Sequence, residues 1–333
     1  MAAAIASCMV RGQPLQTIAE LSTIDGRVDL RGFPLESANT AGKSYLFRQY
    51  VVQPLSGGVR FSRLRLDAVD LSLARINNAV WERCSLTDVK FDHSEWTESG
   101  LWACEVSNAS FDMARMSGST IGGNLGAEAC SYANCSFNGT DLRDSGHTFT
   151  TYNNCSFGAA NLLEVDFDGA RFTNCKFEGT LDSTAFHVYS RLASSALVKW
   201  RKLDTRQFIN KMDGVDFENA RLRYVNFDGV DLTRCRFARD GRHLVIRNQH
   251  EVFVRVRDVV SREWPGCDRQ AALDELDGMY LSVEKLHGMF VTEDKLKQPV
   301  AVINLDDYID SYGKELGAKI FALIASVNSQ VNQ

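Results

Sequence analysis

The chain has 333 residues, of which 24% are charged, and its formal net charge is −5. This length allows a large buried core and one to three domains. A mildly acidic chain lacks the basic footprint of non-specific nucleic-acid binding, and no segment approaches the length of a membrane span. We therefore expect no direct nucleic-acid partner and no membrane partner. The first ten residues are too short and too weakly apolar for a secretory signal.

Residues 1–58 are predicted to hold an N-terminal cap and an irregular first coil. Val28-Asp29-Leu30 and Phe33-Pro34-Leu35 look like two repeat units, and the pattern is lost over 36–58. Ala41-Gly42-Lys43-Ser44 imitates the end of a phosphate-binding loop. That loop needs Gly at position 37, where the chain has Ser37, and a helix must follow it. Nucleotide binding is therefore not expected.

From Phe61 to Phe237, in three blocks, every fifth residue is large and apolar, apart from one histidine, and the residue two before it is small. Neither a helix nor a plain strand has a period of five. A short fixed period over much of a chain indicates a solenoid. The central residues are Phe61, Leu66, Leu71, Ile76, Trp81, Leu86, Phe91, Trp96, Leu101, Val106, Phe111, Met116 and Ile121, then Tyr132, Phe137, Leu142, His147, Tyr152, Phe157, Leu162, Phe167, Phe172 and Phe177, then Phe217, Leu222, Phe227, Leu232 and Phe237.

A corner every five residues would turn the central residues and their small partners inward. Four sides then close a coil of about 20 residues, and coils stack about 4.8 Å apart through backbone hydrogen bonds. The sequence shows this longer period, because Asn134-Cys135-Ser136-Phe137 recurs as Asn154-Cys155-Ser156-Phe157. Like residues one coil apart are expected to form internal ladders.

Several units share the pattern of a small residue, Asp or Asn, and then Leu or Phe. Good copies are Val69-Asp70-Leu71, Ala160-Asn161-Leu162, Val165-Asp166-Phe167, Val215-Asp216-Phe217 and Val230-Asp231-Leu232. This pattern resembles the pentapeptide-repeat family. The resemblance implies a mainly β fold, a right-handed quadrilateral parallel β-helix, over residues 59–241.

Three residue types in the repeat invite a chemical interpretation. Seven of the nine cysteines occupy small inward positions, which favours core packing, and no metal-ligand spacing is present. Asp and Asn before each central residue, as at Asp70 and Asp216, are expected to bind the turn backbone rather than to catalyse. His147 is predicted to be a core histidine, with a general base as the alternative. We expect no cofactor and no metal.

The pattern breaks twice. Between Ile121 and Tyr132 the spacing is 11 residues, which predicts a small bulge or loop that is either a tolerated insertion or part of a contact surface. Residues 181–212 are predicted to be a helical insertion, capped by Ser183 or Thr184, with Phe186 on its apolar face. This stretch has six basic and two acidic residues, a net charge of +4. It either packs on the solenoid with a solvated basic face or binds a partner, and the candidate partner-binding residues are Arg191, Lys199, Trp200, Arg201, Lys202 and Arg206.

Residues 242–333 are predicted to form a C-terminal helical cap or domain. Apolar residues recur at helical spacing over 268–290 and over 304–328. Asp268 is a plausible cap of the first helix, and Asp306 and Asp307 favour the start of the second. Val252–Val260 fits either a strand or a helix.

A packed solenoid offers rigid faces rather than an interior pocket, which favours a non-enzymatic protein-binding scaffold in the cytoplasm: an adaptor, an effector or an immunity-type partner. The family resemblance implies an alternative, a bacterial DNA mimic that protects or inhibits DNA gyrase or topoisomerase IV. Residues 59–180 carry 10 basic and 16 acidic residues, a net charge of −6. A continuous acidic face would favour the mimic, and a patchwork of charges would favour the adaptor. A homodimer through a terminal cap is also possible, and an enzyme in 242–333 has no supporting constellation.

Overall fold

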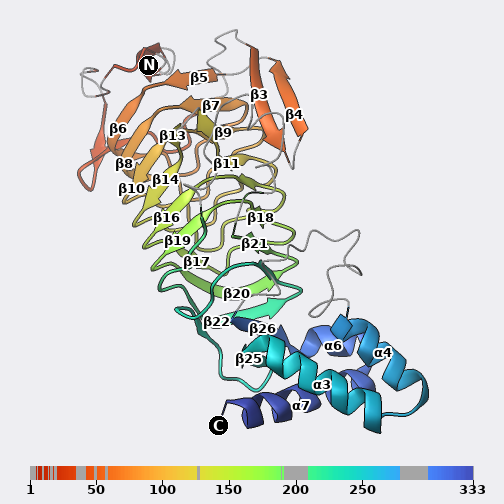
Figure 1. Cartoon of the computed structure of the whole chain (residues 1–333). Helices are drawn as coiled ribbons and strands as arrows, with labels where there is room; N and C mark the ends of the chain where they lie inside the picture. The colour runs from red at the N-terminus through yellow and green to blue at the C-terminus, as the bar shows by residue number, and fades with distance from the viewer. Residues whose placement is uncertain are drawn as a thin grey trace.

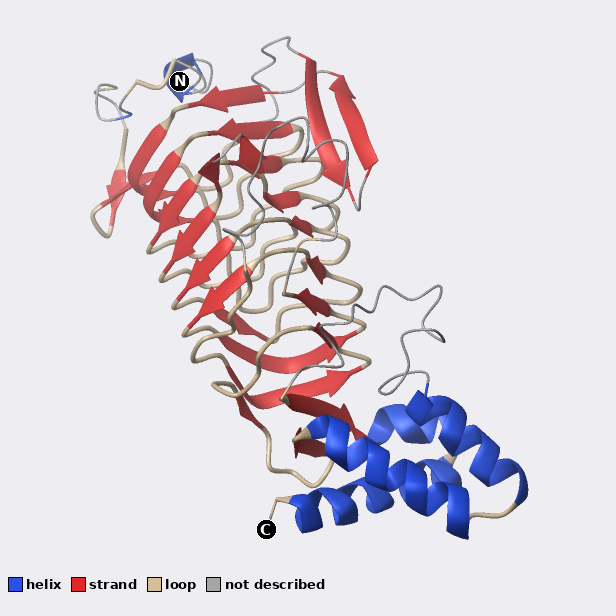
Figure 2. Ribbon diagram, in the orientation of Figure 1, coloured by secondary structure: helices blue, strands red, loops and turns tan. Residues whose placement is uncertain are grey.

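The computed structural model is an elongated stack of coils with a helical domain at one end (Figure 1). It describes residues 5, 7–9, 11–13, 15, 18, 21–34, 59–125, 128–188, 190, 209–277 and 299–332, and the backbone of two strands within 43–56. The coils form a right-handed β-helix with four faces, which we number in chain order from the face that contains Leu66. Strands of successive coils lie side by side along the stack (Figure 2).

The first and fourth faces are eight-stranded sheets. Apart from the antiparallel pair of the first two strands, pairing is parallel with partners usually 20 residues apart, as in Leu66↔Leu86 and Phe61↔Trp81, so the predicted coil length is confirmed. The first sheet contains β1 (Thr23–Ile24), β2 (Arg27–Asp29), β6 (Arg65–Asp70), β8 (Ser85–Lys90), β10 (Glu105–Ser107), β14 (Ser131–Ala133), β16 (Thr151–Asn153) and β19 (Arg171–Thr173). The fourth contains β5 (Val59–Ser62), β7 (Ala79–Glu82), β9 (Gly100–Trp102), β11 (Thr120–Gly122), β15 (Gly146–His147), β18 (Asp166–Phe167), β21 (Ala185–His187) and β23 (Asn226–Asp228).

The second and third faces have fewer regular strands. The second face contains β17 (Ser156–Gly158), β20 (Lys176–Asp182), β22 (Asp216–Arg223) and β24 (Arg236–Phe237). The third is linked largely by single parallel bridges such as Arg75↔Glu95 and Arg115↔Asp141. Side chains at the predicted inward positions fill the space between the faces. Phe137, Phe157 and Phe177 stack with ring centroids 5.0 and 4.8 Å apart, which confirms the predicted ladders.

The N-terminal end of the stack is covered. Val28 pairs with Val69, and Pro34 bridges to Arg75, so residues 28–34 form part of a coil that precedes the regular stack. Buried Ile5, Cys8, Met9 and Leu15 belong to the same core, and residues 7–9 are helical. The antiparallel hairpin β3 (Lys43–Arg48) and β4 (Val51–Ser56) follows. Lys43 and Ser44 therefore begin a strand and not the helix that a phosphate-binding loop requires.

The first break is larger than the sequence spacing indicates. Val106 pairs with Tyr132, a separation of 26 residues instead of 20, so the coil carries six extra residues rather than one. The antiparallel hairpin β12 (Asn124–Leu125) and β13 (Glu128–Ala129) accommodates them. Its first strand packs Leu125 against Trp102 and Val80 on the fourth face. The next coil resumes in the correct register because the whole excess leaves the stack at one corner.

The predicted insertion begins later than expected. Leu181 and Phe186 are buried in the solenoid, and Phe186 stacks on Phe167 and Phe227 at 5.0 and 5.3 Å. Ser183 occupies a left-handed corner (φ 53°), and the Thr184 hydroxyl donates to the carbonyl of Leu162, so neither residue caps a helix. The step from Phe177 to the next inward residue, Leu181, is four residues instead of five. The five-residue period then continues one position earlier than the sequence pattern predicted, which places Phe186 inside the coil. Tyr189 and residues 191–208 lie outside the described part of the chain.

The C-terminal domain combines a two-stranded sheet with helices. β25 (His243–Arg247) pairs antiparallel with β26 (Val300–Asn304). The described helices are α3 (Gln249–Glu263), α4 (Gly266–Leu276), α6 (Leu305–Tyr312) and α7 (Lys314–Val331). Helix α3 resolves the ambiguity over 252–260. Asp268 lies in the first turn of α4 rather than at its cap, and residues 278–298 are not described.

The predicted single helix over 304–328 is wrong, because Gly313 (φ 78°) separates α6 from α7. The two helices pack on one another where Gly317 lies against the backbone of Tyr308, and a Cβ on Gly317 would lie 2.3 Å from that carbonyl oxygen. As expected, Asp306 and Asp307 lie in the first turn of α6, and the Asn304 side chain accepts from the N–H of Asp306 at 3.0 Å.

Candidate interaction surfaces

The partner-binding residues proposed from the sequence are all outside the described part of the chain. Arg191, Lys199, Trp200, Arg201, Lys202 and Arg206 lie within 191–208. The chain leaves and re-enters the stack at neighbouring points, because the N–H of Asn210 donates to the carbonyl of Val188 at 3.0 Å. The described surfaces that a partner could meet are the outer faces of the coils and the junction with the helical domain.

Opposite charges alternate on the outer faces. Corresponding residues of successive coils pair across the stack, as in Arg115–Glu95 at 3.1 Å and Arg236–Asp216 at 2.7 Å. Further pairs are Arg60–Glu82 (3.1 Å), Lys176–Glu178 (2.5 Å), Arg234–Asp213 (2.9 Å) and Arg143–Asp141 (2.7 Å). Exposed pairs of this kind contribute little to stability, because water and salt screen them. Their main consequence is that the acidic residues of the described solenoid form a patchwork with basic ones.

The acidic and amide residues of the repeat act on the backbone, as predicted. The carboxylate of Asp70 accepts from the N–H of Ser72 at 2.9 Å, and Asp216 accepts from Glu218 at 2.8 Å. On the second face, Asp112 accepts from the N–H of Asn138 in the next coil at 2.8 Å, and Asn138 accepts from Gly158 at 2.8 Å. The same contact in coil after coil is a structural device rather than a single active site.

The fourth face holds a polar cluster that the sequence analysis did not find. His187 lies between two carboxylates, 3.3 Å from Asp166 and 3.3 Å from Asp228. The hydroxyl of Ser190 donates to Asp168 at 2.6 Å, so it contacts this aspartate rather than the histidine. The contacting pairs are 21, 41 and 22 positions apart in sequence, and only the stacking of coils brings them together. Their sequence signal is a polar residue directly after the central residue of successive coils, at Asp168, His187 and Asp228.

His147 is the predicted core histidine. It is fully buried, with Nε2 2.7 Å from the Ser145 hydroxyl and Nδ1 2.6 Å from the Tyr152 hydroxyl. Burial lowers the pKa of His147 to about 3, so the ring is neutral at physiological pH. The cysteine positions are confirmed too: every inward cysteine is buried except Cys235, which is half-buried.

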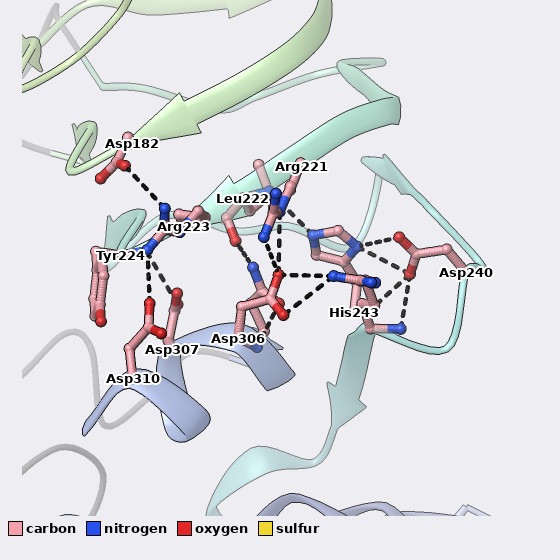
Figure 3. Close-up of polar contacts among 12 residues, drawn as sticks. Asp182, Arg221, Leu222, Arg223, Tyr224, Asp240, His243, Asp306, Asp307 and Asp310 are labelled. Atoms are coloured by element: carbon pink, nitrogen blue, oxygen red, sulfur yellow. Dashed lines mark hydrogen bonds and ion pairs between the residues drawn. The ribbon is translucent and has the colours of Figure 1, made fainter. Parts of the chain in front are cut away.

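The junction between the last coils and the helical domain is a cluster of arginine–aspartate pairs (Figure 3). From β22, Arg221 contacts Asp306 (2.5 Å) and Arg223 contacts Asp310 (2.6 Å), both on α6. Arg242 also reaches Asp306, at 3.2 Å. Burial opposes the charged form of Asp306, but the hydrogen bonds from Arg221 and Arg242 outweigh it and lower the pKa of this carboxyl. The pairs hold α6 against the end of the stack.

Asp307 differs from its two neighbours. Its Oδ2 accepts from the N–H of Tyr224 at 3.0 Å, while its Oδ1 is buried with no hydrogen-bond partner. Burial raises the pKa of Asp307 to about 6. Arg223, which lowers the pKa of Asp307 through its charge, also contacts Asp310 and Asp182. The junction therefore contains one carboxylate that is destabilised by its surroundings at neutral pH.

No group of three or more His, Cys, Asp or Glu side chains within the described ranges is placed to hold a metal ion. None of the described helices is long and apolar enough to cross a membrane.

Comparison with known proteins identifies the repeats. The family of pentapeptide repeats matches residues 148–180 and 211–238, in 8 copies. No curated protein matches the chain. The fold is similar to solved structures of QnrB1, described as a plasmid-mediated fluoroquinolone resistance protein. One of these is 16% identical, covers 53% of this chain and 73% of its own, and has a TM-score of 0.29.

A second similar structure is HetL from the cyanobacterium Nostoc sp. strain PCC 7120, described as a pentapeptide-repeat protein involved in heterocyst differentiation regulation. It is 14% identical, covers 54% of this chain and 85% of its own, and has a TM-score of 0.20.

Proposed function

Because this chain is a pentapeptide-repeat protein, we propose that it is a non-enzymatic cytoplasmic scaffold that binds another protein through its rigid outer faces. The observation that carries the proposal is the patchwork of charge on those faces. Pairs such as Arg115–Glu95 and Arg236–Asp216 give a partner both signs of charge at fixed spacing. Complementary charge of this kind provides specificity and register in a protein interface.

The interior supports the same proposal. Trp81, Trp96, Tyr132, Tyr152 and Phe157 are fully buried and fill the described part of the coil interior with packed rings. A packed interior leaves the outer surface as the place for recognition. The nine cysteines are free, which fits the reducing conditions of the cytoplasm.

The alternative is a DNA mimic that acts on DNA gyrase or topoisomerase IV. A mimic of duplex DNA needs closely spaced negative charge, one per about 1.7 Å of helix axis. On the described solenoid, arginine or lysine offsets many of the carboxylates, so the observed charge pattern favours the scaffold.

A pull-down from the native cytosol distinguishes the two functions. The bait is the full-length protein, compared with a variant in which a short Gly-Ser linker replaces 191–208. The linker can close this gap, because Val188 and Asn210 are hydrogen-bonded. Recovery of a partner other than a type II topoisomerase supports the scaffold. Recovery of a gyrase or topoisomerase IV subunit supports the alternative, and loss of the partner with the linker variant assigns the contact to the segment that holds Trp200. Failure of the full-length protein to recover any partner argues against both.

A further inference from the structure

One corner of the solenoid carries large side chains that contribute little to its core. Leu73, His93 and Met113 follow one another along the corner between the second and third faces, and we call them the corner ridge. Backbone hydrogen bonds place them in successive coils, since Leu73 donates to Asp92 and His93 donates to Asp112. Leu73 is 60% exposed and Met113 is 55% exposed, the two largest values among the exposed apolar side chains of the described chain.

The backbone conformation of the ridge is one that leucine and methionine rarely adopt. All three have positive φ, at 61°, 57° and 60°, a conformation that glycine and asparagine adopt most readily. Elsewhere in the same row the chain places Gly32, Gly139, Ala159 and Gly179. Leucine and methionine at this corner are unfavourable for the backbone and expose apolar surface to water. Exposed apolar groups gathered in one place are typical of a contact surface.

Gly139 makes room for the ridge. A Cβ on Gly139 would lie 2.4 Å from the sulfur of Met113, so the thioether rests along the corner above this glycine. The ridge therefore ends at Met113, because the same row continues with the small residues Gly139, Ala159 and Gly179. A methionine side chain of this kind adapts its shape to a partner.

The second-face side of the ridge carries negative charge. The outer surface of that face presents three aspartates, Asp70, Asp92 and Asp112, and one lysine, Lys90, in these three coils. Asp92 accepts from the N–H of Asp112 at 3.1 Å, and neither of these two carboxylates forms an ion pair with another described residue. On the third face, two residues beyond the ridge, Arg75, Glu95 and Arg115 carry a net charge of +1, and Glu95 is paired with Arg115.

We propose that the corner ridge binds a segment of a partner protein in which apolar side chains alternate with lysine or arginine. The apolar side chains contact Leu73 and Met113, and the cations face Asp92 and Asp112. This inference rests on the proposed scaffold function and assigns it a surface and a class of partner.

Two double variants test the two halves of the proposal. The ridge variant, Leu73→Asn with Met113→Gly, removes the apolar surface and introduces residues suited to positive φ. The charge variant, Asp92→Asn with Asp112→Asn, removes the charge but keeps an oxygen that accepts the cross-coil hydrogen bonds, as Asn138 does. The control is Leu163→Gln, which removes another exposed apolar side chain (39%) from the third face.

The measurement is fluorescence anisotropy with a labelled peptide of alternating leucine and lysine, compared with a peptide of alternating leucine and glutamate. We expect the full-length wild type to bind the lysine peptide preferentially. Both double variants should weaken binding by about tenfold or more, while the control stays within about twofold. The ridge variant should melt at the wild-type temperature or above, so that its loss of binding is not a loss of fold.

The inference would be overturned by no binding of the lysine peptide, by equal binding of the glutamate peptide, or by unchanged binding of either double variant. A dimer in sedimentation that the ridge variant abolishes would also overturn it, because the occupant would then be a second copy of this chain. The pull-down separates this failure from that of the scaffold. If the ridge variant still recovers the partner in the pull-down, the corner-ridge proposal is wrong and the scaffold proposal stands.

Discussion

The imidazole Nε2 of His243 accepts a hydrogen bond from the backbone N–H of Leu222 at 3.0 Å. On the same residue, the side-chain amide of Asn304 donates to the carbonyl oxygen. Leu222 lies in the last coils, so these two side chains of the C-terminal domain take the place of the backbone of a following coil. The ring is oriented by Asp240, which lies 3.0 Å from Nδ1. The helical domain therefore closes the backbone of the solenoid as well as covering its apolar end.

Replacing His243 with alanine should destabilise this junction. The substitution leaves the buried N–H of Leu222 without a partner, which costs about 1–3 kcal/mol. The measurement is the free energy of unfolding in urea, together with limited proteolysis of the 239–243 connection. His250→Ala, at an exposed position of α3, is the matched control. Equal stability of the two variants would contradict the proposed role of His243.

Asp307→Asn should stabilise the protein at neutral pH. The pKa of Asp307 is raised to about 6 in the folded state, so folding favours its protonated form. Protonation of Asp307 therefore stabilises the folded state fully below about pH 4, and this stabilisation is lost as the pH rises through 6. The amide has no charge to bury, so the variant should gain about 1–2 kcal/mol above pH 7, after allowance for solvent screening, and nothing near pH 4.

Urea unfolding of wild type and Asp307→Asn across this pH range measures the difference. Asp306→Asn is the opposite control. The pKa of Asp306 is lowered, so its stabilising contribution is present at neutral pH and is lost in acid. A gain for Asp307→Asn that does not change with pH would mean that burial of charge is not its cause.

The interior ladder makes Phe157 a sensitive position. Phe157 is fully buried between Phe137 and Phe177, and Phe157→Ala would leave a cavity in a narrow interior, at a cost of about 3–5 kcal/mol. Phe157→Asp would bury an unpaired charge and should prevent folding. Lys176→Ala removes only an outward side chain and should leave the melting temperature close to that of the wild type. Thermal melts of the three variants test the assignment, and a wild-type melting temperature for Phe157→Asp would refute it.

Gly317 tests the packing of α6 on α7. A methyl group there would meet the backbone of Tyr308 at 2.3 Å, and backbone atoms do not move aside easily. We expect Gly317→Ala to destabilise the helical domain by about 1–3 kcal/mol, seen as an earlier loss of helical circular dichroism on heating. Ala322→Gly, at an exposed position of the same helix, controls for helix propensity alone. An unchanged melt for Gly317→Ala would show that the helices do not approach as closely as described.

Most of the solenoid was predictable because its rule is local. The direction of each side chain depends on its place within a five-residue corner, so Phe137, Phe157 and the inward cysteines could be assigned without knowledge of the fold. The same reasoning misplaced Phe186. A single four-residue step at Leu181 moved the phase by one, so Phe186 faces the interior of the coil.

What the sequence by itself determined is the repeat: which positions face inward, how long a coil is, and where regular coils stop. Only the tertiary structure decided the contacts between distant segments. The Arg221–Asp306 pair joins residues 85 positions apart, and the corner ridge exists because Leu73, His93 and Met113 stack in successive coils. The physical reason is that a periodic pattern records which side of the backbone a residue occupies. It does not record which residue of another segment will meet that residue once the coils and the helical domain have packed.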